Sequence, residues 1–98
     1  MNPWVIQPID DTVDRKLRKL FKSNSNLIKN YKCFIQELEF VDDPAEIGDR
    51  KHGRYKDCFG RHMTKSISLL YSINYTERIV YLVDLDDHKN LYGRDNHS

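Results

Sequence analysis

The spacing of apolar residues changes midway along the chain, and this change limits the folds open to it. Between residues 13 and 38 the apolar side chains recur every three or four positions, which predicts two amphipathic helices. From residue 66 to 75 they alternate with polar ones, and residues 79 to 85 form a nearly continuous apolar run. These patterns predict a strand with one buried face and a central strand. Helices packed against a sheet are therefore expected.

The two predicted helices have recognisable ends. Asp10 or Asp11 can cap the first helix, because a carboxylate accepts hydrogen bonds from the unpaired N–H groups of a first turn. A polar segment separates the helices, and Ser25 or Asn26 can cap the second. Pro44 ends the second helix, because proline disfavours the helical conformation in the residue before it. The sequence thus predicts an αα-hairpin.

The remaining elements are expected to be strands. Residues 4 to 6 form a short apolar strand, residues 58 to 64 a weaker one, and residues 75 to 78 connect the two longer strands. The predicted class is α+β with the order β-α-α-β-β-β, in which the helical hairpin packs on a small, mainly antiparallel sheet. The 98 residues, 1–98, are expected to form one domain.

Composition excludes several classes of protein. A hydrophobic content of 39% and a charged content of 32% are typical of a folded chain, not a disordered one. No run approaches the roughly 18 apolar residues of a membrane span, and the first residues do not resemble a signal peptide. The protein is therefore expected to be cytoplasmic, with no membrane partner and with Cys33 and Cys58 reduced.

Positive charge is concentrated in one segment. Residues 48 to 66 carry six Lys or Arg and two Asp, a net charge of +4, whereas the whole chain carries +1. For the binding of phosphate, the local patch matters and the total charge does not. On composition alone, a solvated charged loop remains the simpler interpretation. The cations are Arg50, Lys51, Arg54, Lys56, Arg61 and Lys65.

Three histidines, His52, His62 and His88, lie within this segment or after the last predicted strand. One imidazole could remove the proton of a ribose 2′-OH and another protonate the leaving 5′-oxygen, while cations stabilise the phosphorane. Their spacing matches no zinc signature, so no metal or other cofactor is expected. On spacing alone, three exposed polar residues are the favoured interpretation.

Aromatic residues near the same segment are candidates for stacking on bases. Phe59 lies in a predicted strand, so we expect it in the core. Tyr55 lies among the cations, and Tyr92 follows the last strand within polar sequence, which makes Tyr92 the better stacking candidate. Cys58 has no acid–base partner at a recognised spacing and is interpreted as a packing residue.

An ordered set of motifs resembles the RelE/ParE toxin superfamily of type II toxin–antitoxin modules. The motifs are DDP-x-x-IG-x-x-K-H-G-R-Y-K, S-x-x-LLY-x-I-x-Y and RIVYLVD-x-x-DH-x-x-LYG, in that order. The chain is most similar to the RelE-like and YafQ-like branches, which cleave mRNA in the ribosomal A site. ParE-like members instead inhibit DNA gyrase.

The resemblance implies roles for individual residues. His88 would be the general acid, and His62 or His52 the base. Tyr92 would stack on a base or orient the nucleophile, since His88-x-x-x-Tyr92-Gly93 resembles the His-x-x-x-Phe-Gly ending of YafQ-like members. The RNA-binding residues implied for mRNA and 16S rRNA are Lys51, Arg54, Lys56, Arg61 and Lys65.

Three positions depart from the pattern of these relatives. Ser68 stands where many RelE-like toxins have an arginine that steadies the scissile phosphate. Ser66 replaces an aspartate of YafQ-like members, and Asp84 replaces one of their arginines.

The function implied is that of a toxin acting as a ribosome-dependent, metal-independent endoribonuclease that inhibits translation. Its implied partners are a cognate antitoxin, which folds as it binds, and the ribosome with mRNA and 16S rRNA. Two alternatives stay open: a ParE-like gyrase inhibitor, and an inactive homologue that only binds its antitoxin.

Overall fold

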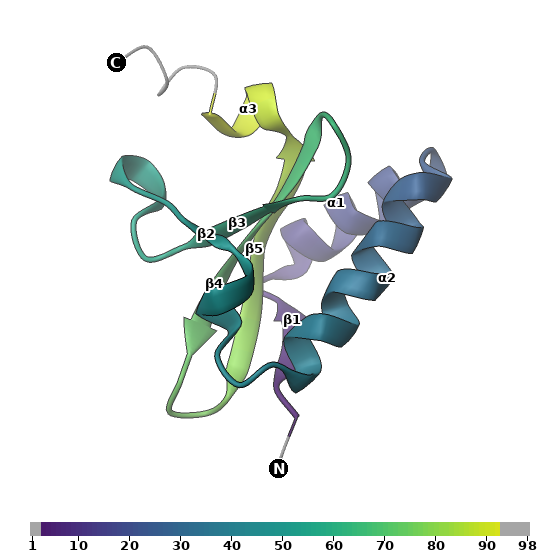
Figure 1. The fold of residues 1–98 in the computed structure, drawn as a ribbon. Coiled ribbons are helices and arrows are strands. Elements are labelled where there is room, and N and C mark those ends of the chain that lie inside the picture. Colours follow the sequence, from purple (N-terminus) through teal and green to yellow (C-terminus); the bar gives the residue numbers. More distant parts are fainter. Residues whose placement is uncertain (1–2, 93–98) are drawn as a thin grey trace.

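A five-stranded sheet with two long helices on one side makes up most of the structure (Figure 1). The computed structural model describes residues 3–92, and of His88 and Tyr92 it describes the backbone only. The strands are β1 (Val5–Pro8), β2 (Asp49–Arg50), β3 (Phe59–His62), β4 (Ile67–Asn74) and β5 (Ile79–Asp87). The helices are α1 (Asp11–Lys22), α2 (Ser25–Phe40) and α3 (His88–Tyr92), with short 3₁₀ turns η1 (Pro44–Ile47) and η2 (Gly53–Tyr55).

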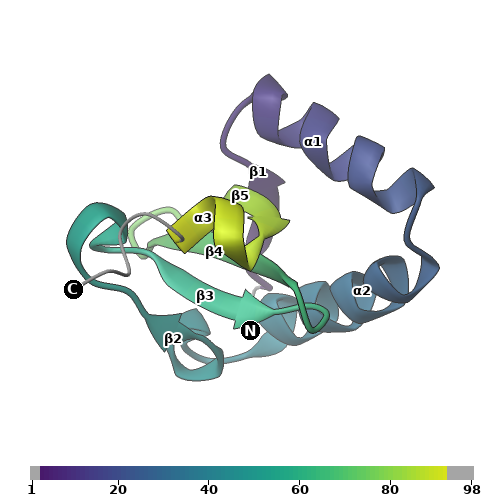
Figure 2. The same ribbon diagram turned by 90° about the horizontal axis from the view of Figure 1, so that it is seen from above.

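The strands lie in the order β1-β5-β4-β3-β2. β1 pairs in parallel with β5, and the other three pairs are antiparallel. Seen from above, α1 and α2 both lie to one side of the sheet, whereas α3 continues from the end of β5 (Figure 2). The predicted α+β class, with a helical hairpin on a mainly antiparallel sheet, is confirmed.

The helix ends follow from local hydrogen bonds. Asp10 caps α1, because its Oδ1 accepts a 2.9 Å hydrogen bond from the Val13 N–H. The predicted cap of α2 at Ser25 or Asn26 is wrong: Asn24 is the cap, and its Oδ1 accepts from the Leu27 N–H at 3.3 Å. Asn24 has an extended backbone, whereas Ser25 already begins the helix, so only Asn24 reaches the third helical N–H.

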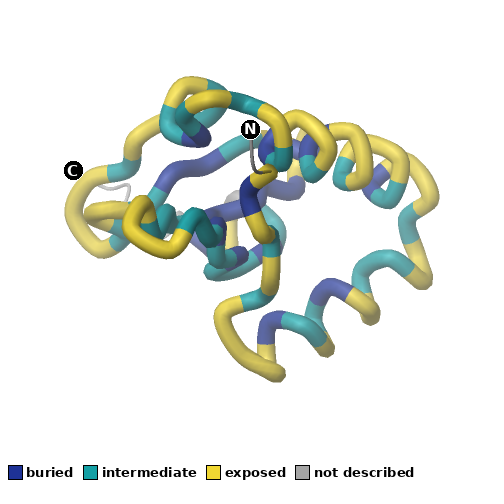
Figure 3. Tube along the Cα trace, turned by 90° about the horizontal axis from the view of Figure 1, so that it is seen from below, coloured by how far each residue is buried: buried dark blue, intermediate teal, exposed yellow. Residues whose placement is uncertain are grey.

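A core of apolar side chains fills the space between α1, α2 and the sheet. Leu27, Phe34 and Leu38 of α2 and Leu69 and Tyr71 of β4 are all at most 2% exposed. Figure 3 shows the buried positions along the central strands and on the inner sides of the helices. Burying each such side chain contributes about 1.5–3 kcal/mol, so this core holds the hairpin onto the sheet.

Tyr71 is the centre of this core. Its ring centroid lies 5.7 Å from that of Phe34 and 5.7 Å from that of Phe59, which confirms that Phe59 is a core residue. The Tyr71 hydroxyl donates a 2.7 Å hydrogen bond to the Pro44 carbonyl. Burial raises the pKa of the Tyr71 phenol, so the hydroxyl keeps its proton and remains a donor.

A β-bulge in β5 changes which side chains face the core. Tyr71 is paired with Leu82 but Leu70 with Asp84, so Val83 is an extra residue in the ladder. Leu82 and Leu85, three positions apart, therefore both reach the helix-facing core. Without the bulge, side chains would alternate strictly between the two faces, and Leu82 and Leu85 would lie on opposite faces of the sheet. The apolar pattern of the sequence does not reveal this extra residue.

Four short elements were not predicted from the sequence: β2, α3 and the two 3₁₀ turns. β2 has two residues and exists because it pairs with Gly60 and Phe59 of β3. α3 has five residues, too few to show a helical period. These elements carry much of the segment in which the candidate functional residues lie.

Gly48 gives a test of the packing around Tyr71. A Cβ at position 48 would overlap the Tyr71 hydroxyl and lie 2.9 Å from ring atom Cζ. We expect Gly48→Ala to lower the free energy of unfolding by about 1–3 kcal/mol, because the buried ring has no room to move. Urea denaturation followed by circular dichroism measures this change.

The matched control is Gly53→Asn. Gly53 has φ +66°, which asparagine tolerates, and nothing lies within 4 Å of a Cβ built there. We expect it to change the free energy of unfolding by less than about 1 kcal/mol. Equal effects of the two substitutions would contradict the close approach at Gly48.

Candidate functional site

The face of the sheet away from α1 and α2 holds a second, smaller apolar cluster. Leu70 of β4 and Leu91 of α3 are buried against each other, and Tyr55 and Val83 pack beside them. Tyr55 belongs to η2 and Leu91 to α3, so the cluster brings two unpredicted elements onto the same face. The candidate site is built around this cluster, which we call the open-face cluster.

The cationic loop, residues 51–58, projects to the side of the sheet opposite α1 and α2 (Figure 1). Its base is closed by a 3.0 Å hydrogen bond from the Lys51 N–H to the Cys58 carbonyl. Arg54 and Lys56 flank Tyr55 and are exposed, and the Arg54 guanidinium lies 5.6 Å from the centroid of the Tyr55 ring. The packing of Tyr55 therefore places these two cations next to the open face.

His62 and Ser68 form a cross-strand pair on this face. They lie directly opposite one another in β3 and β4, and Ser68 Oγ is 3.2 Å from His62 Nδ1. Ser68 is 2% exposed, whereas His62 is exposed. The neighbours of Ser68 in β4, Ile67 and Leu69, belong to the core on the helix side, so the pair points the other way. One edge of the imidazole thus contacts a buried hydroxyl, and His62 as a whole residue is exposed.

The same cross-strand row ends at α3. Ser68 is also paired with Asp86 of β5, so His62, Ser68 and Asp86 lie side by side across three strands. With strands spaced about 4.8 Å apart, the backbones of His62 and Asp86 are roughly 10 Å apart. His88 begins α3 two residues after Asp86, and Tyr92 ends it. The predicted roles of the His88 and Tyr92 side chains, and of Gly93, lie outside the described part of the chain.

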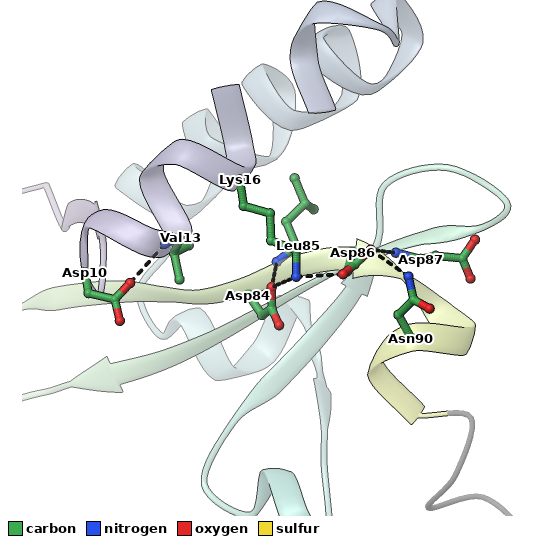
Figure 4. Close-up of polar contacts among 8 residues, drawn as sticks. All are labelled: Asp10, Val13, Lys16, Asp84, Leu85, Asp86, Asp87 and Asn90. Carbon is green, nitrogen blue, oxygen red and sulfur yellow. Dashed lines mark hydrogen bonds and ion pairs between the residues drawn. The ribbon is translucent and has the colours of Figure 1, made fainter. Parts of the chain in front are cut away.

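An ion-pair network fixes the start of α3 (Figure 4). Lys16 of α1 lies 2.6 Å from Asp86 Oδ2 and 2.9 Å from Asp84 Oδ1. The other oxygen of Asp86 accepts a 3.1 Å hydrogen bond from the Asn90 side chain of α3. Asp87 Oδ1 accepts from the Lys89 N–H at 2.8 Å. Asp86 thus connects α1 to α3.

The network shifts the pKa of both partners. Burial alone would raise the pKa of Asp86, but hydrogen bonds from Lys16, Asn90 and the Asp87 N–H outweigh it and lower the pKa. Burial alone would lower the pKa of Lys16, but hydrogen bonds to Asp86 and Asp84 outweigh it and raise the pKa. Both groups are therefore more firmly charged in the folded protein than in the unfolded chain.

Two of the predicted RNA-binding cations lie on the helix side of the sheet. The Arg61 guanidinium lies 4.7 Å from the Phe34 ring centroid, donates a 3.0 Å hydrogen bond to the Ile47 carbonyl and pairs with Glu37. Lys65 lies in the turn after β3 and lines a hollow of about 570 Å³ next to the N-terminus of α2. The structure does not bring them together with the cationic loop.

His52, the other predicted base, lies away from His62. It precedes η2 in the cationic loop and is exposed. The loop joins β3 at Phe59, and His62 is the last residue of that strand, about 10 Å further along. Of the two candidate bases, His62 is thus the one in the row that leads to α3.

Among the side chains that the structure describes, no three His, Cys, Asp or Glu residues are grouped to hold a metal ion. Within residues 3–92, no helix is both long and apolar enough to cross a membrane.

The pKa of the Cys58 thiol is raised, mainly by burial and to a smaller extent by the negative charge of Asp57. A protonated thiol is a poor nucleophile, in keeping with the predicted packing role of Cys58.

Sequence reasoning did not identify Lys16, Asp86 or Asn90 as part of the site. Lys16 lies on the polar face of a predicted helix, where lysines are usually solvated. One signal was present in the sequence: the acidic run Asp84-Leu-Asp86-Asp87 at the end of an apolar strand, which needs a cation nearby to be stable.

Lys16→Met tests the connection between α1 and α3. Removing the ammonium leaves Asp84 and Asp86 close together without their cation, so we expect a loss of about 1–2 kcal/mol at pH 7. Urea denaturation measures the loss, and amide hydrogen exchange should increase at Asn90 and Leu91.

The loss should depend on pH. The Asp86 contribution is present above the unfolded pKa of about 3.9 and disappears as the pH falls through the lowered folded value. Lys16→Met and the parent chain should therefore converge in stability under acid. Arg18→Met is the control, because the Arg18–Asp14 pair is exposed and should contribute less than about 0.5 kcal/mol. A pH-independent difference would contradict the network.

The fold is similar to those of solved toxin structures. A YoeB–YefM complex from Staphylococcus aureus gives a TM-score of 0.69 at 9% identity, covering 86% of this chain and 97% of that one. The toxin–antitoxin complex RelBE2 from Mycobacterium tuberculosis gives 0.61 at 21% identity, covering 90% and 94%. A metal-bound toxin from Helicobacter pylori gives 0.64 at 22% identity, covering 90% and 98%.

No family model matches the chain, and no curated protein matches its sequence. The similarity thus lies in the arrangement of the helices and strands. It agrees with the motifs from Asp42 to Gly93 and with the order of elements that the sequence predicted. The chain has the fold of the RelE/ParE toxins.

Proposed function

We propose that this chain is the single-domain toxin of a type II toxin–antitoxin module and cleaves mRNA on the ribosome without a metal ion. The observation that carries the proposal is the cross-strand row on the open face. It places the anchored, exposed imidazole of His62 near α3, the helix that begins with His88. Solved toxins with this fold, two of them in toxin–antitoxin complexes, support the assignment.

In the proposed reaction, His62 removes the proton from the ribose 2′-OH. The 2′-oxygen forms a bond to phosphorus, and the bond from phosphorus to the 5′-oxygen breaks. His88 gives a proton to that 5′-oxygen, so the products are a 2′,3′-cyclic phosphate and a 5′-OH. Tyr92 orients the nucleophile or stacks on a base. The two imidazoles end the reaction with their protons exchanged, so no other co-reactant is needed.

Phosphate binding falls mainly to the cationic loop. Arg54 and Lys56 are exposed beside Tyr55, and Lys51 lies at the base of the loop. Arg61 already contacts Phe34, Glu37 and the Ile47 carbonyl. Its main role in this proposal is therefore structural, not the binding of phosphate. Lys65, on the helix side, would contact a different part of the RNA, such as 16S rRNA.

An antitoxin is the proposed protein partner, because two of the similar solved structures are toxin–antitoxin complexes. Acidic or apolar segments of the antitoxin would cover the cationic loop and the open-face cluster, folding as they bind. A bound antitoxin would then block the approach of RNA to His62.

The replacement of an expected arginine by Ser68 favours a second candidate. The hydroxyl of Ser68 contacts His62 and supplies no charge to a scissile phosphate. A toxin that inhibits gyrase, or a homologue that only binds its antitoxin, would not need that charge. The two candidates are separated by whether mRNA is cut.

The test adds the purified chain to translating ribosomes and maps the 3′ ends of the mRNA. We expect new ends within the A-site codon, and a single-turnover rate that falls roughly 100- to 10,000-fold in His62→Ala, because a general base is removed. His52→Ala is the matched control and should retain most of the rate. Intact mRNA together with a block of gyrase supercoiling would support the second candidate instead.

A second test measures the salt dependence of ribosome binding. Arg54→Gln and Lys56→Gln each remove one cation from the loop. A plot of log K for ribosome binding against log salt has a negative slope. This slope should become less negative by about 1 for each phosphate that the variant no longer neutralises. Lys32→Gln is the control, since Lys32 is exposed on α2, on the far side of the sheet. Equal changes in all three variants would rule out a specific role for the cationic loop.

A further inference from the structure

The second half of β5 is a free edge of the sheet. β1 pairs with β5 only from Ile79 to Leu82, and among residues 3–92 no strand lies on that side of residues 83–87. A free edge presents unpaired backbone groups, which can pair with a strand of another chain. We therefore looked at how the backbone N–H groups of this edge are satisfied.

The bulge at Val83 decides which residues face the edge. Before the bulge, Leu82 faces β1, because its carbonyl accepts a 2.9 Å hydrogen bond from the Ile9 N–H. Backbone groups of alternate residues point to opposite sides of a strand, and one extra residue shifts this alternation by one. After the bulge, the N–H groups of Leu85 and Asp87 therefore point away from β4 and toward the free edge.

Both of these N–H groups are occupied by the side chain of the preceding residue (Figure 4). The Leu85 N–H donates to Asp84 Oδ1 at 2.8 Å, and the Asp87 N–H donates to Asp86 Oδ1 at 2.7 Å. A strand added at this edge would have to offer its carbonyl groups to the same two donors. Each carboxylate thus takes the place that the carbonyl of a neighbouring strand would occupy.

Lys16 holds the two carboxylates on the edge. Its Nζ lies 2.9 Å from Asp84 Oδ1 and 2.6 Å from Asp86 Oδ2. The Asn90 side chain adds a 3.1 Å hydrogen bond to Asp86 Oδ1. Two carboxylates this close repel each other unless a cation lies between them. The ammonium of Lys16 therefore allows both to stay on the backbone N–H groups.

We propose that Asp84 and Asp86, held by Lys16, form a cover that keeps the free edge of β5 from pairing with the same edge of a second copy of the chain. A two-fold axis at Leu85 would place this residue opposite its counterpart, each N–H donating to the other carbonyl. The edge is thus complementary to itself once its donors are free. The cover acts through its acceptor oxygens, and it does not depend on the proposed nuclease function.

Asp84→Ala tests the cover, because it frees the Leu85 N–H and leaves Asp86 bound to Lys16 and Asn90. In sedimentation velocity without RNA, the variant should associate as its concentration rises, and the parent chain should stay monomeric. Amide hydrogen exchange at Leu85 locates the contact. In dilute solution exchange should be roughly 3- to 10-fold faster than in the parent chain, because one acceptor is lost.

At high concentration the same Leu85 amide should become protected, because the second copy supplies a carbonyl. An Asp84→Ala chain that stays monomeric, or a parent chain that already associates through this edge, would overturn the proposal. Asp84→Val is a second variant without an acceptor, and valine favours the strand conformation, so it should associate as well.

Asp84→Asn is the matched control. It loses the same charge as Asp84→Ala but keeps an oxygen that can accept the Leu85 N–H, so it should stay monomeric. Association of Asp84→Asn equal to that of Asp84→Ala would show that charge and not the hydrogen bond protects the edge, and would overturn the proposal. Asp42→Ala removes an exposed carboxylate after α2 and should also leave the chain monomeric.

Discussion

The packing of Tyr71 is the interaction on which the rest of the structure depends. Its ring joins Phe34 of α2 to Phe59 of β3, and its hydroxyl holds the Pro44 carbonyl at 2.7 Å. One side chain thus attaches the helical hairpin to the sheet and also fixes where the chain goes after α2. The segment from Pro44 to Gly48 lies against Tyr71, and the next residues form β2 and the cationic loop. The site on the open face therefore inherits its position from the core on the other face.

The bulge at Val83 positions side chains in the part of the sheet formed by β4 and β5. By adding one residue it lets Leu82 and Leu85 both reach the core, and it sets Asp86 opposite Ser68. β1 ends at Pro8, paired with Leu82, so β5 has no strand beyond it from Val83 onward within the described residues. Lys16 of α1 occupies that edge and neutralises the two carboxylates. The chain thereby turns acidic residues at a strand end into an anchor for α3.

Most of the fold could be predicted from the sequence, and most of the site geometry could not. The helices and the two long strands carry clear apolar periods, so their existence and order follow from burial alone. The caps show the limit of such reasoning: Asn24 and Ser25 have similar propensities, and only the backbone conformation separates them. β2, η2 and α3 are too short to have a period, and they are held by pairing and by the open-face cluster.

The same difference applies to the candidate residues. Histidines and cations indicate a possible chemistry by their residue type. The register of the paired strands decides which of these side chains lie close together. The pairing of β3 with β4 puts His62 against Ser68, and the alternation of β3 sends Arg61 toward Phe34 on the opposite face. A shift of one residue in this register would exchange the two side chains. The bulge, the register and the Lys16 network are tertiary features, so residue types alone do not reveal them.

Ser68 departs from the pattern of the RelE-like toxins, and its burial in β4 gives a physical reason for a small side chain at this position. An arginine at this place would bring charge to a phosphate, but it would also have to leave the buried row between Ile67 and Leu69. With serine there, the strand stays closely packed, and the positive charge moves to Arg54 and Lys56 on the cationic loop. The hydroxyl of Ser68 instead contacts the imidazole of His62, which lies directly opposite it in β3.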